Sequence, residues 1–379
     1  MHQRRLFVKA VLEQKLSVAK LCELFQISRK TGYKWLRRVY GPDGWAGLAD
    51  RSRRPHSNSR AVPDAVVCRL VHLRDEHPTW GARKLAAWLA WREPRWDLPA
   101  PSTITEILKR HGLVRARRVR RRAPPRTAPL AHAAFANDVW CIDLKGDFVV
   151  GDGTRCYPLT VTDACTRTLL CCRAFERTGR VGVQAALERT FHTYGLPKHL
   201  RSDNGPPFGT SCSSPLSKLG VWLVKLGVMP EYIDPGKPQQ NGRHERMHLT
   251  LKQETAQPPS STMIAQQRRF NAFIREYNHE RPHEALGQIT PAALYAPSPR
   301  PFPSRILAPE YSNAHHVHVV GPDGRFRWRN RSMLVGSALA GEPVGVLEVD
   351  DDCWDFYFGP FLVARVHDRI ELGMRPRPE

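Results

Sequence analysis

The chain has 379 residues, of which 41% are hydrophobic and 25% are charged. This length exceeds that of one ordinary folding unit and suits about two to four modules. No apolar run approaches the ~20 residues of a membrane span, and the N-terminus lacks the hydrophobic stretch of a secretion signal. The nine cysteines form no CxxC pair and no metal-ligand spacing, which is typical of reduced thiols. We therefore expect a cytoplasmic protein without a membrane partner.

Positive charge is concentrated in the first third of the chain. The net charge is +22, and residues 1–130 hold 29 Lys and Arg against 10 Asp and Glu, whereas the remainder holds 29 against 26. Basic side chains bind nucleic acids because displacing condensed counterions from phosphates is favourable. A generally Arg-rich genome is an alternative source of charge, but it would not predict so uneven a division. The first third is therefore predicted to bind nucleic acid.

Residues 1–45 are predicted to form a helix-turn-helix DNA-binding domain. Apolar residues recur at helical spacing, and Ser17 and Ser28 are placed to cap the second and third helices. The third helix, residues 29–40, begins with basic and hydroxyl side chains, where a recognition helix touches the major groove. A plain basic three-helix bundle is the alternative. The predicted DNA-binding residues of this helix are Arg29, Lys30, Thr31 and Lys34.

Residues 60–114 are predicted to form a second module similar to a helix-turn-helix. Helices are expected near residues 63–76, 81–90 and 102–111, the last capped by Ser102. Its small core is expected to come from four tryptophans, Trp80, Trp88, Trp91 and Trp96.

Residues 115–130 are predicted to form a basic linker. Six of the eight residues from 115 to 122 are arginines, and helix-breaking prolines follow them. Such a run is usually a solvated tail, but beside a helix-turn-helix it favours an extended arm on DNA. The predicted DNA-binding residues of the arm are Arg117, Arg118, Arg120, Arg121 and Arg122.

The sequence pattern changes from helical to mixed in residues 131–296, where an α/β core of the ribonuclease H kind is predicted. Three strand-like runs are followed by alternating helices and strands. The expected strands are residues 139–150, 157–162, 169–175, 198–202 and 229–233. The expected helices are residues 180–194, 215–226, 239–254 and 262–277.

A β-rich C-terminal domain is predicted for residues 305–370. Short apolar runs at residues 316–320, 326–328, 343–349, 354–358 and 361–366 are separated by Gly and Asp turns. The expected outcome is a small β-barrel, which completes a multidomain fold of all-α modules, an α/β core and a barrel.

Three acidic residues are candidates for catalysis and metal binding. Asp143 lies within an apolar strand, Asp203 lies where a strand ends in an Asn-Gly turn, and Glu245 lies early in a helix that follows a Pro/Gly loop. Phosphodiester cleavage can use two divalent cations, and Mg²⁺ prefers carboxylate oxygens. Two Mg²⁺ ions, with Mn²⁺ as a substitute, are therefore expected. Asp138 and Asp147 are rivals for the first position, with Asp147 the closer second choice.

Together these motifs carry a family resemblance. Trp-x-x-Asp ending at Asp143, Ser-Asp-Asn-Gly around Asp203 and Pro-x-x-Pro-Gln-x-Asn-Gly-x-x-Glu-Arg around Glu245 resemble the integrase core of bacterial insertion-sequence transposases and retroviral integrases. The similarity covers residues 138–295, and residues 277–283 are similar to the segment that follows the core in insertion-sequence members. By the resemblance, Asp143 and Asp203 would bridge or flank the metals, and Glu245 would bind one of them.

The resemblance also implies an activity and partners. It implies a bacterial, nucleoid-associated transposase, a polynucleotidyl transferase that cleaves DNA strands and transfers the 3′-hydroxyl. Its partners would be double-stranded DNA, as terminal inverted repeats and target DNA, and further copies of itself in a homodimer or homotetramer. Two alternatives remain: an inactive DNA-binding regulator derived from a transposase, and a simple ribonuclease H-fold nuclease.

Other residues around Glu245 are candidate DNA contacts. Family members use a basic residue near the position of Lys252 to hold the DNA end, although a solvated lysine is equally consistent with the sequence. Arg243, His244 and Arg246 flank Glu245 and are candidates for phosphate contacts, with capping or packing as the alternative. Two features depart from the family: a longer spacing between Asp203 and Glu245, and no N-terminal zinc site.

Overall fold

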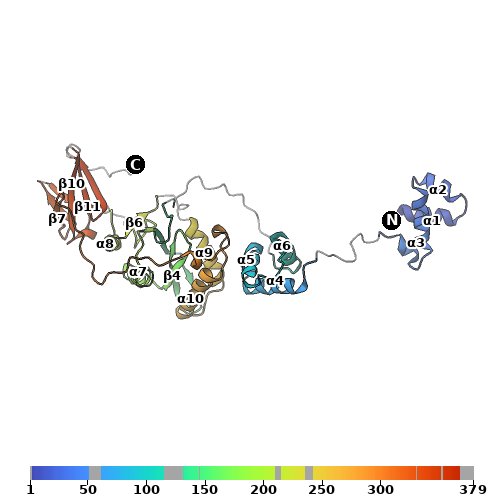
Figure 1. Cartoon of the computed structure of the whole chain (residues 1–379), viewed down its shortest axis with the longest axis horizontal. Helices are drawn as coiled ribbons and strands as arrows, with labels where there is room; N and C mark the ends of the chain where they lie inside the picture. Colours follow the sequence, from blue (N-terminus) through green and yellow to red (C-terminus); the bar gives the residue numbers. More distant parts are fainter. Residues whose placement is uncertain are drawn as a thin grey trace. The chain divides into compact units, whose positions relative to one another are not determined.

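The computed structural model describes most of the chain and divides it into two compact units, Met1–Val62 and Pro63–Glu379 (Figure 1). Arg117, Arg118, Arg120, Arg121 and Arg122 lie outside the described residues, as does the side chain of Arg243. No helix within the described residues is long and apolar enough to cross a bilayer. The described residues are 2–50, 61–114, 130, 132–144, 146–209, 215–234, 242–329, 331–350 and 353–367.

The first unit is a three-helix bundle. It contains α1 (His2–Leu12), α2 (Val18–Leu24), α3 (Arg29–Val39) and a short 3-10 helix, η1 (Gly44–Leu48). The Ser17 side chain accepts a hydrogen bond from the Lys20 amide and the Ser28 side chain accepts one from the Thr31 amide, so both predicted caps are confirmed. A Cβ at Gly32 would lie 2.7 Å from Cys22 Sγ, so only glycine permits this close approach of α3 to α2.

A second helical group opens the second unit, with α4 (Asp64–Glu76), α5 (Ala82–Arg92) and α6 (Pro101–Arg110). Its three helices match the predicted ones, but α6 begins at Pro101, so the predicted Ser102 cap is wrong. The fully buried side chains at its centre are Leu70, Leu73, Trp80, Leu85, Leu89 and Ile104.

The predicted tryptophan core of this group is therefore wrong except for Trp80. Trp91 is 47% exposed, and Trp88 is only partly buried. The guanidinium groups of Arg69 and Arg92 each lie 5.3 Å from the Trp88 ring centroid. Trp88 therefore serves as a cation–π surface, while leucines of the same helix fill the interior.

The core sheet has the strand arrangement expected of the ribonuclease H kind. Its order is β2-β3-β1-β5-β6, and β4 also pairs with β3. The pairs β1–β3 and β3–β4 are antiparallel, while β1–β5 and β5–β6 are parallel. The predicted run 139–150 is two strands, β1 and β2. The bounds are β1 (Val139–Leu144), β2 (Phe148–Val149), β3 (Arg155–Asp163), β4 (Leu169–Phe175), β5 (His199–Ser202) and β6 (Met229–Tyr232).

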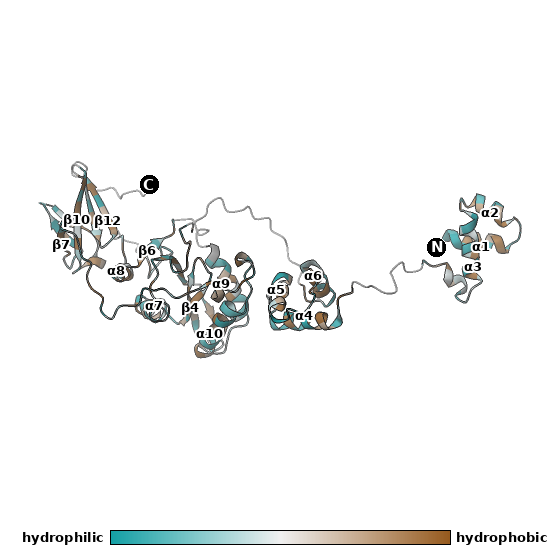
Figure 2. Ribbon diagram, viewed as in Figure 1, coloured by the Kyte–Doolittle hydropathy of each residue, from teal (hydrophilic) through white to brown (hydrophobic). Residues whose placement is uncertain are grey.

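Helices cover both faces of this sheet. On one face, α7 (Arg180–Tyr194) and α8 (Lys218–Lys225) share a buried cluster with Trp140 and Leu159. On the other, α9 (Gly242–Thr255) and α10 (Met263–His279) share a cluster with Cys172. The helices carry both hydrophilic and hydrophobic segments, as amphipathic covering layers require (Figure 2).

The Asn278 side chain connects the end of α10 to the sheet by hydrogen bonds. The buried Asn278 amide accepts a hydrogen bond from the Leu169 N–H and donates one to the Leu169 carbonyl, both at 2.9 Å. A short 3-10 helix, η3 (Glu284–Leu286), and α11 (Pro291–Leu294) follow.

The C-terminal strands do not form the closed barrel that the sequence suggested. Among the described residues they make an open sheet in the order β12-β11-β10-β7 and a separate hairpin, β8–β9. The hairpin packs Phe326 and Met333 against the sheet through side chains instead of completing a hydrogen-bonded ring. The bounds are β7 (His316–Val319), β8 (Arg325–Trp328), β9 (Arg331–Leu334), η4 (Ser337–Leu339), β10 (Pro343–Asp350), β11 (Cys353–Phe358) and β12 (Phe361–His367).

Candidate active site

Two of the three candidate acids end neighbouring strands. The parallel pairing of β1 and β5 sets Val139 opposite His199 and Cys141 opposite Arg201. Continuing that register brings Asp143 level with Asp203, which directly follows β5. Adjacent strands lie about 4.8 Å apart, and side chains at matching positions of parallel strands point to the same face. The two carboxylates therefore emerge from adjacent strand ends on one face of the sheet.

The turn after β5 holds Asp203 through the local chemistry of its Asp-Asn-Gly sequence. Asp203 Oδ1 accepts a hydrogen bond from the Gly205 amide at 3.2 Å. The Asn204 side chain donates to the Ile233 carbonyl at 2.7 Å, which ties the turn to the segment after β6. Such Asx contacts fix the direction of a turn residue without burying it.

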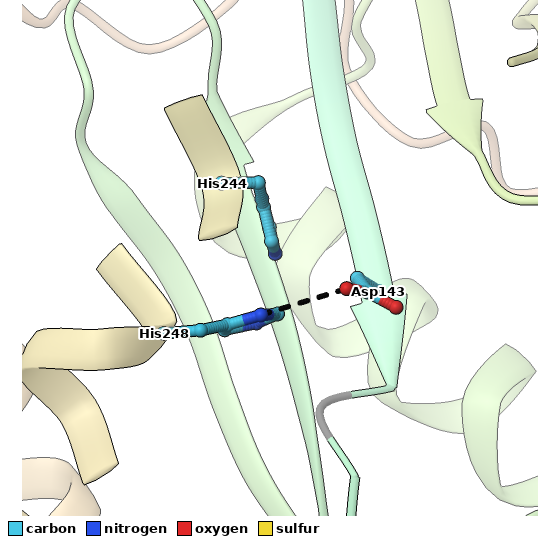
Figure 3. A group of neighbouring side chains, drawn as sticks. All are labelled: Asp143, His244 and His248. Atoms are coloured by element: carbon cyan, nitrogen blue, oxygen red, sulfur yellow. Dashed lines mark ion pairs between the residues drawn. The ribbon is translucent and has the colours of Figure 1, made fainter. Parts of the chain in front are cut away.

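Helix α9 approaches Asp143 through a buried histidine. His248 Nδ1 lies 3.5 Å from Asp143 Oδ2, and Figure 3 shows His248 pointing from the helix toward that carboxylate. The His248 side chain is 1% exposed, whereas that of Asp143 is 25% exposed. Asp143 therefore has one side toward solvent and one toward α9.

Hydrogen-bond contacts of a second histidine, His244, and of two threonines also connect α9 to β3. Thr160 Oγ1 lies 2.7 Å from His244 Nε2 and 2.6 Å from His248 Nε2. Thr162 Oγ1 lies 2.8 Å from His244 Nδ1. These polar contacts are buried, so each is stronger than it would be in water. They fix the distance of the first half of α9 from the sheet and its rotation about the helix axis. This half of the helix carries Glu245.

The structure thus brings some candidate residues together and leaves others apart. Within the described residues, Asp143, His244 and His248 are the group of potential metal ligands whose atoms lie within 4.8 Å of one another. Asp203 and Glu245 are not members of that group. Glu245 is exposed on α9, directly after the buried His244.

Both rivals for the first acidic position are engaged elsewhere. Burial alone would raise the pKa of Asp138, but hydrogen bonds from Lys198 and the Phe135 amide lower it below its ordinary value. Asp147 pairs with Arg155 at the start of β3. Asp143 is accordingly the acid of this region that faces α9.

Predicted DNA-binding residues occupy the exposed side of their helices where they are described. Arg29, Lys30 and Lys34 are exposed on α3, and Lys252 is exposed on α9. Thr31 is half-buried, and its hydroxyl lies 2.9 Å from that of Ser28. It therefore completes the cap of α3 in addition to lying at the start of that helix.

The sequence interpretation missed most of the buried polar cluster. Of the two readings open for His244, packing is the one the structure bears out, because this side chain is 1% exposed and bonded to Thr160 and Thr162. His248 was not singled out. The available signal was the spacing of four residues between the two histidines, which places both on one face of a helix. Nothing in the sequence indicated which strand that face would meet.

The donor set of this site suits divalent cations. Carboxylate oxygens are the usual ligands of Mg²⁺ and Mn²⁺, and imidazole nitrogen is a usual ligand of transition metals. The carboxylates end rigid strands, and the imidazoles project from a helix that is bonded to the same sheet. The site can therefore hold a cation against a substrate that approaches from the exposed side of Asp143.

Family models match both the helical modules and the core. Two models described as Integrase core domain match residues 134–238 and 226–291. A model described as Helix-turn-helix domain matches residues 3–56, and one described as Homeodomain-like domain matches residues 31–108. The helix-turn-helix prediction and the integrase-like core are therefore confirmed.

Proteins of bacterial insertion elements are similar to most of this chain. One is an uncharacterized 31.7 kDa protein of insertion element IS407 from Burkholderia multivorans. It is 30% identical over 235 residues, which cover 62% of this chain and 81% of the relative. The chain belongs to the insertion-element transposases with an integrase core. An IS476 protein of Xanthomonas euvesicatoria, also named as uncharacterized, is 28% identical to this transposase over 66% of the chain and 70% of the relative.

Solved retroviral structures are more distant. The simian T-cell lymphotropic virus intasome, in complex with the PP2A regulatory subunit B56 gamma, is 16% identical with a TM-score of 0.38 and covers 79% of this transposase and 100% of the matched chain. The HTLV-2 integrase catalytic core in complex with magnesium is 13% identical with a TM-score of 0.34. The match covers 42% of this transposase and 97% of the integrase core.

Proposed function

We propose that this transposase binds the terminal inverted repeats of its element and catalyses metal-dependent DNA strand cleavage followed by transfer of the 3′-hydroxyl to target DNA. The observation that supports this most directly is the shared register of β1 and β5. Continued by two residues beyond the Cys141–Arg201 pair, this register would carry both Asp143 and Asp203 on one face at adjacent strand ends. Helix α9 carries Glu245 and meets the same edge through His248.

In this proposal Asp143, Asp203 and Glu245 are the metal ligands and catalytic residues. Two Mg²⁺ ions, or Mn²⁺ in their place, would supply an activated oxygen nucleophile and stabilise the leaving oxygen. The protein's contribution is to hold the carboxylates in place. Strand β1 holds Asp143, the turn after β5 holds Asp203, and the His244 and His248 contacts to Thr160 hold the part of α9 from which Glu245 projects.

DNA binding is assigned to the basic part of the chain. We propose a helix-turn-helix domain at residues 1–45, a second module at 60–114 and a basic linker at 115–130, with the core at 131–296 and a β-rich domain at 305–370. Nucleoid DNA would be the site of action, and a homodimer or homotetramer would hold two ends. The proposed contacts are Arg29, Lys30, Thr31, Lys34, Arg117, Arg118, Arg120, Arg121, Arg122, Arg243 and Lys252.

The test is a strand-transfer assay with Mg²⁺ on labelled DNA that carries the repeats flanking the gene. We expect the wild-type protein to join these ends to target DNA, and Asp203→Asn to abolish joining while binding in a gel shift persists. Glu348→Gln removes an exposed acid on β10 of the separate C-terminal sheet and serves as the matched control. A wild-type protein that binds the ends but neither cuts nor joins them would show a regulator instead. Cleavage without joining would show a simple nuclease.

A further inference from the structure

Hydrogen-bond geometry constrains the protons of the buried polar cluster beneath Asp143. The Thr160 hydroxyl has one proton and two lone pairs, and three polar atoms surround it. It donates to the Asp143 carbonyl oxygen at 3.3 Å, because a carbonyl can only accept. Its lone pairs then accept the Nε2–H groups of His244 at 2.7 Å and His248 at 2.6 Å. Thr160 therefore requires an N–H group at Nε2 of His248.

When His248 is neutral, this arrangement leaves a lone pair on its other nitrogen. A neutral imidazole with its proton on Nε2 presents Nδ1 as an acceptor. This Nδ1 lies 3.5 Å from Asp143 Oδ2, which also carries lone pairs. With His248 1% exposed, water screens the repulsion between the two atoms poorly. Positive charge between the two atoms, from a proton on Nδ1 or from a metal ion that displaces this proton, turns the repulsion into attraction.

We propose that His248 Nδ1 and Asp143 Oδ2 together ligate one divalent cation of the catalytic site, and that this position favours Mn²⁺ and other transition metals over Mg²⁺. The inference rests on the proposed function of Asp143 as a metal ligand and adds a nitrogen ligand to it. Imidazole suits transition metals, whereas Mg²⁺ keeps to oxygen donors. The added ligand therefore sets the metal preference of the site.

The separation of the two atoms is compatible with a shared cation. Ligand atoms about 2.1 Å from a metal lie about 3.0 Å apart at a right angle and about 3.4 Å apart at the tetrahedral angle. The observed 3.5 Å lies close to the upper figure. Because the Asp143 side chain is 25% exposed, a small rotation can bring its oxygen nearer without disturbing the core.

The surroundings of His248 match those of metal-binding histidines in general. Such a histidine donates its second ring N–H to a fixed acceptor, which holds the tautomer and the ring orientation. Thr160 Oγ1 is that acceptor, and β3 holds it in place. His244 differs, because Thr160 and Thr162 lie within hydrogen-bond distance of its two nitrogens. We therefore assign His244 to positioning α9 and His248 to metal ligation.

The decisive measurement is pulsed electron paramagnetic resonance of the full chain loaded with Mn²⁺ alone. Protein labelled with ¹⁵N-histidine should show a hyperfine coupling between Mn²⁺ and nitrogen that changes with the isotope. Bound Mn²⁺ without any histidine coupling would overturn the proposal. The wild-type spectrum decides this alone, so a variant that fails to fold does not remove the test.

Variants identify the histidine. His248→Gln should remove the coupling, while His244→Gln and the exposed, distant His279→Gln should keep it. Loss of the coupling in His244→Gln with retention in His248→Gln would contradict the assignment. Thr160→Val keeps the shape of the side chain but removes the acceptor, and about a tenfold to hundredfold weaker Mn²⁺ binding is expected. Unchanged Mn²⁺ affinity in this variant would show that Thr160 does not orient a ligand.

The metal preference gives a second readout. The ratio of the Mg²⁺ to the Mn²⁺ dissociation constant, measured by calorimetry, should fall in His248→Gln because Mn²⁺ loses a ligand that Mg²⁺ uses poorly. An unchanged ratio would count against the proposal. Failure of this inference is distinguishable from failure of the proposed function. Mn²⁺ bound through oxygens with strand transfer intact refutes only the nitrogen ligand, whereas no divalent-cation binding at all refutes both.

Discussion

Helices α3 and α9 both carry proposed functional side chains in their first turns, yet they are held in different ways. The start of α3 is capped by Ser28 from its own segment, and Arg29, Lys30 and Lys34 are exposed. The first half of α9 is bonded through buried histidines to Thr160 and Thr162, more than eighty positions earlier in the chain. A helix that presents charges to a partner needs only local sequence. A helix that aims a carboxylate needs contacts from elsewhere.

The largest expected effect concerns the carboxylate that α9 carries. Glu245→Gln should lower the rate of strand transfer by about a hundredfold to a thousandfold, the usual result of removing one group that stabilises charge in the transition state. The measurement is single-turnover joining of labelled end DNA. Glu348→Gln, on β10 of the C-terminal sheet, should join at the wild-type rate. If Glu245→Gln joined DNA as fast as the control variant, α9 would carry no essential acid. The proposed difference between α3 and α9 would then be wrong.

The corresponding change on α3 should alter binding and not chemistry. Replacing Arg29, Lys30 and Lys34 together with alanine should weaken binding to end DNA. The slope of log affinity against log salt should become shallower by about 0.9 for each DNA phosphate that the variant no longer neutralises. The slope is measured by titrating labelled DNA at several salt concentrations. A wild-type slope in the triple variant would assign the charge-dependent binding to other residues.

A stability change in the core should be larger than one in the first unit. Asn278→Ala leaves the Leu169 N–H and carbonyl of β4 buried without the amide that bonds both, and we expect a loss of about 1–3 kcal/mol in the free energy of unfolding. Denaturant titration of the second unit measures it. Asn271→Ala, at an exposed position of the same helix, is the control and should change stability little. Equal losses in the two variants would contradict the role of the Asn278 amide.

The smallest expected effect is loss of the cap of α3. Ser28→Ala removes the acceptor for the Thr31 amide and should cost about 1 kcal/mol in the stability of the first unit. Thermal unfolding of residues 1–62, followed by helical circular dichroism beside the full chain, measures it. Ser28→Asp restores an acceptor and should recover the loss. If Ser28→Ala were as stable as the wild type, the Ser28 cap would not contribute to the stability of the first unit.

Elements with strong local signals were predicted well from the sequence. Strand β4 and helix α7 have the predicted bounds, and Ser17 and Ser28 cap the predicted helices. Hydrophobic periodicity and capping are local, so they can be read without the fold. The α/β class of the core also followed, since few folds suit three strands followed by alternating helices and strands.

Predictions that depended on distant partners were less successful. The tryptophans of the second module were expected inside, but leucines of the same helices fill its core, since hydrophobicity alone does not say which face turns inward. The barrel was expected because short strands suggest closure, whereas in the described part of the chain the β8 and β9 strands form a separate two-stranded sheet. Strand β9 was missed, because its run from Arg331 to Leu334 contains little apolar alternation.

By itself the sequence determined the helix-turn-helix modules, the integrase-like core and the family, because these depend on periodicity, capping and motif order along the chain. The three acids remain candidates that the sequence named. Only the tertiary structure decided that the strands leading to Asp143 and Asp203 pair in parallel and that His248 faces Asp143. The physical reason is that buried polar side chains require partners, and the fold alone brings Thr160 of β3 to the histidines of α9.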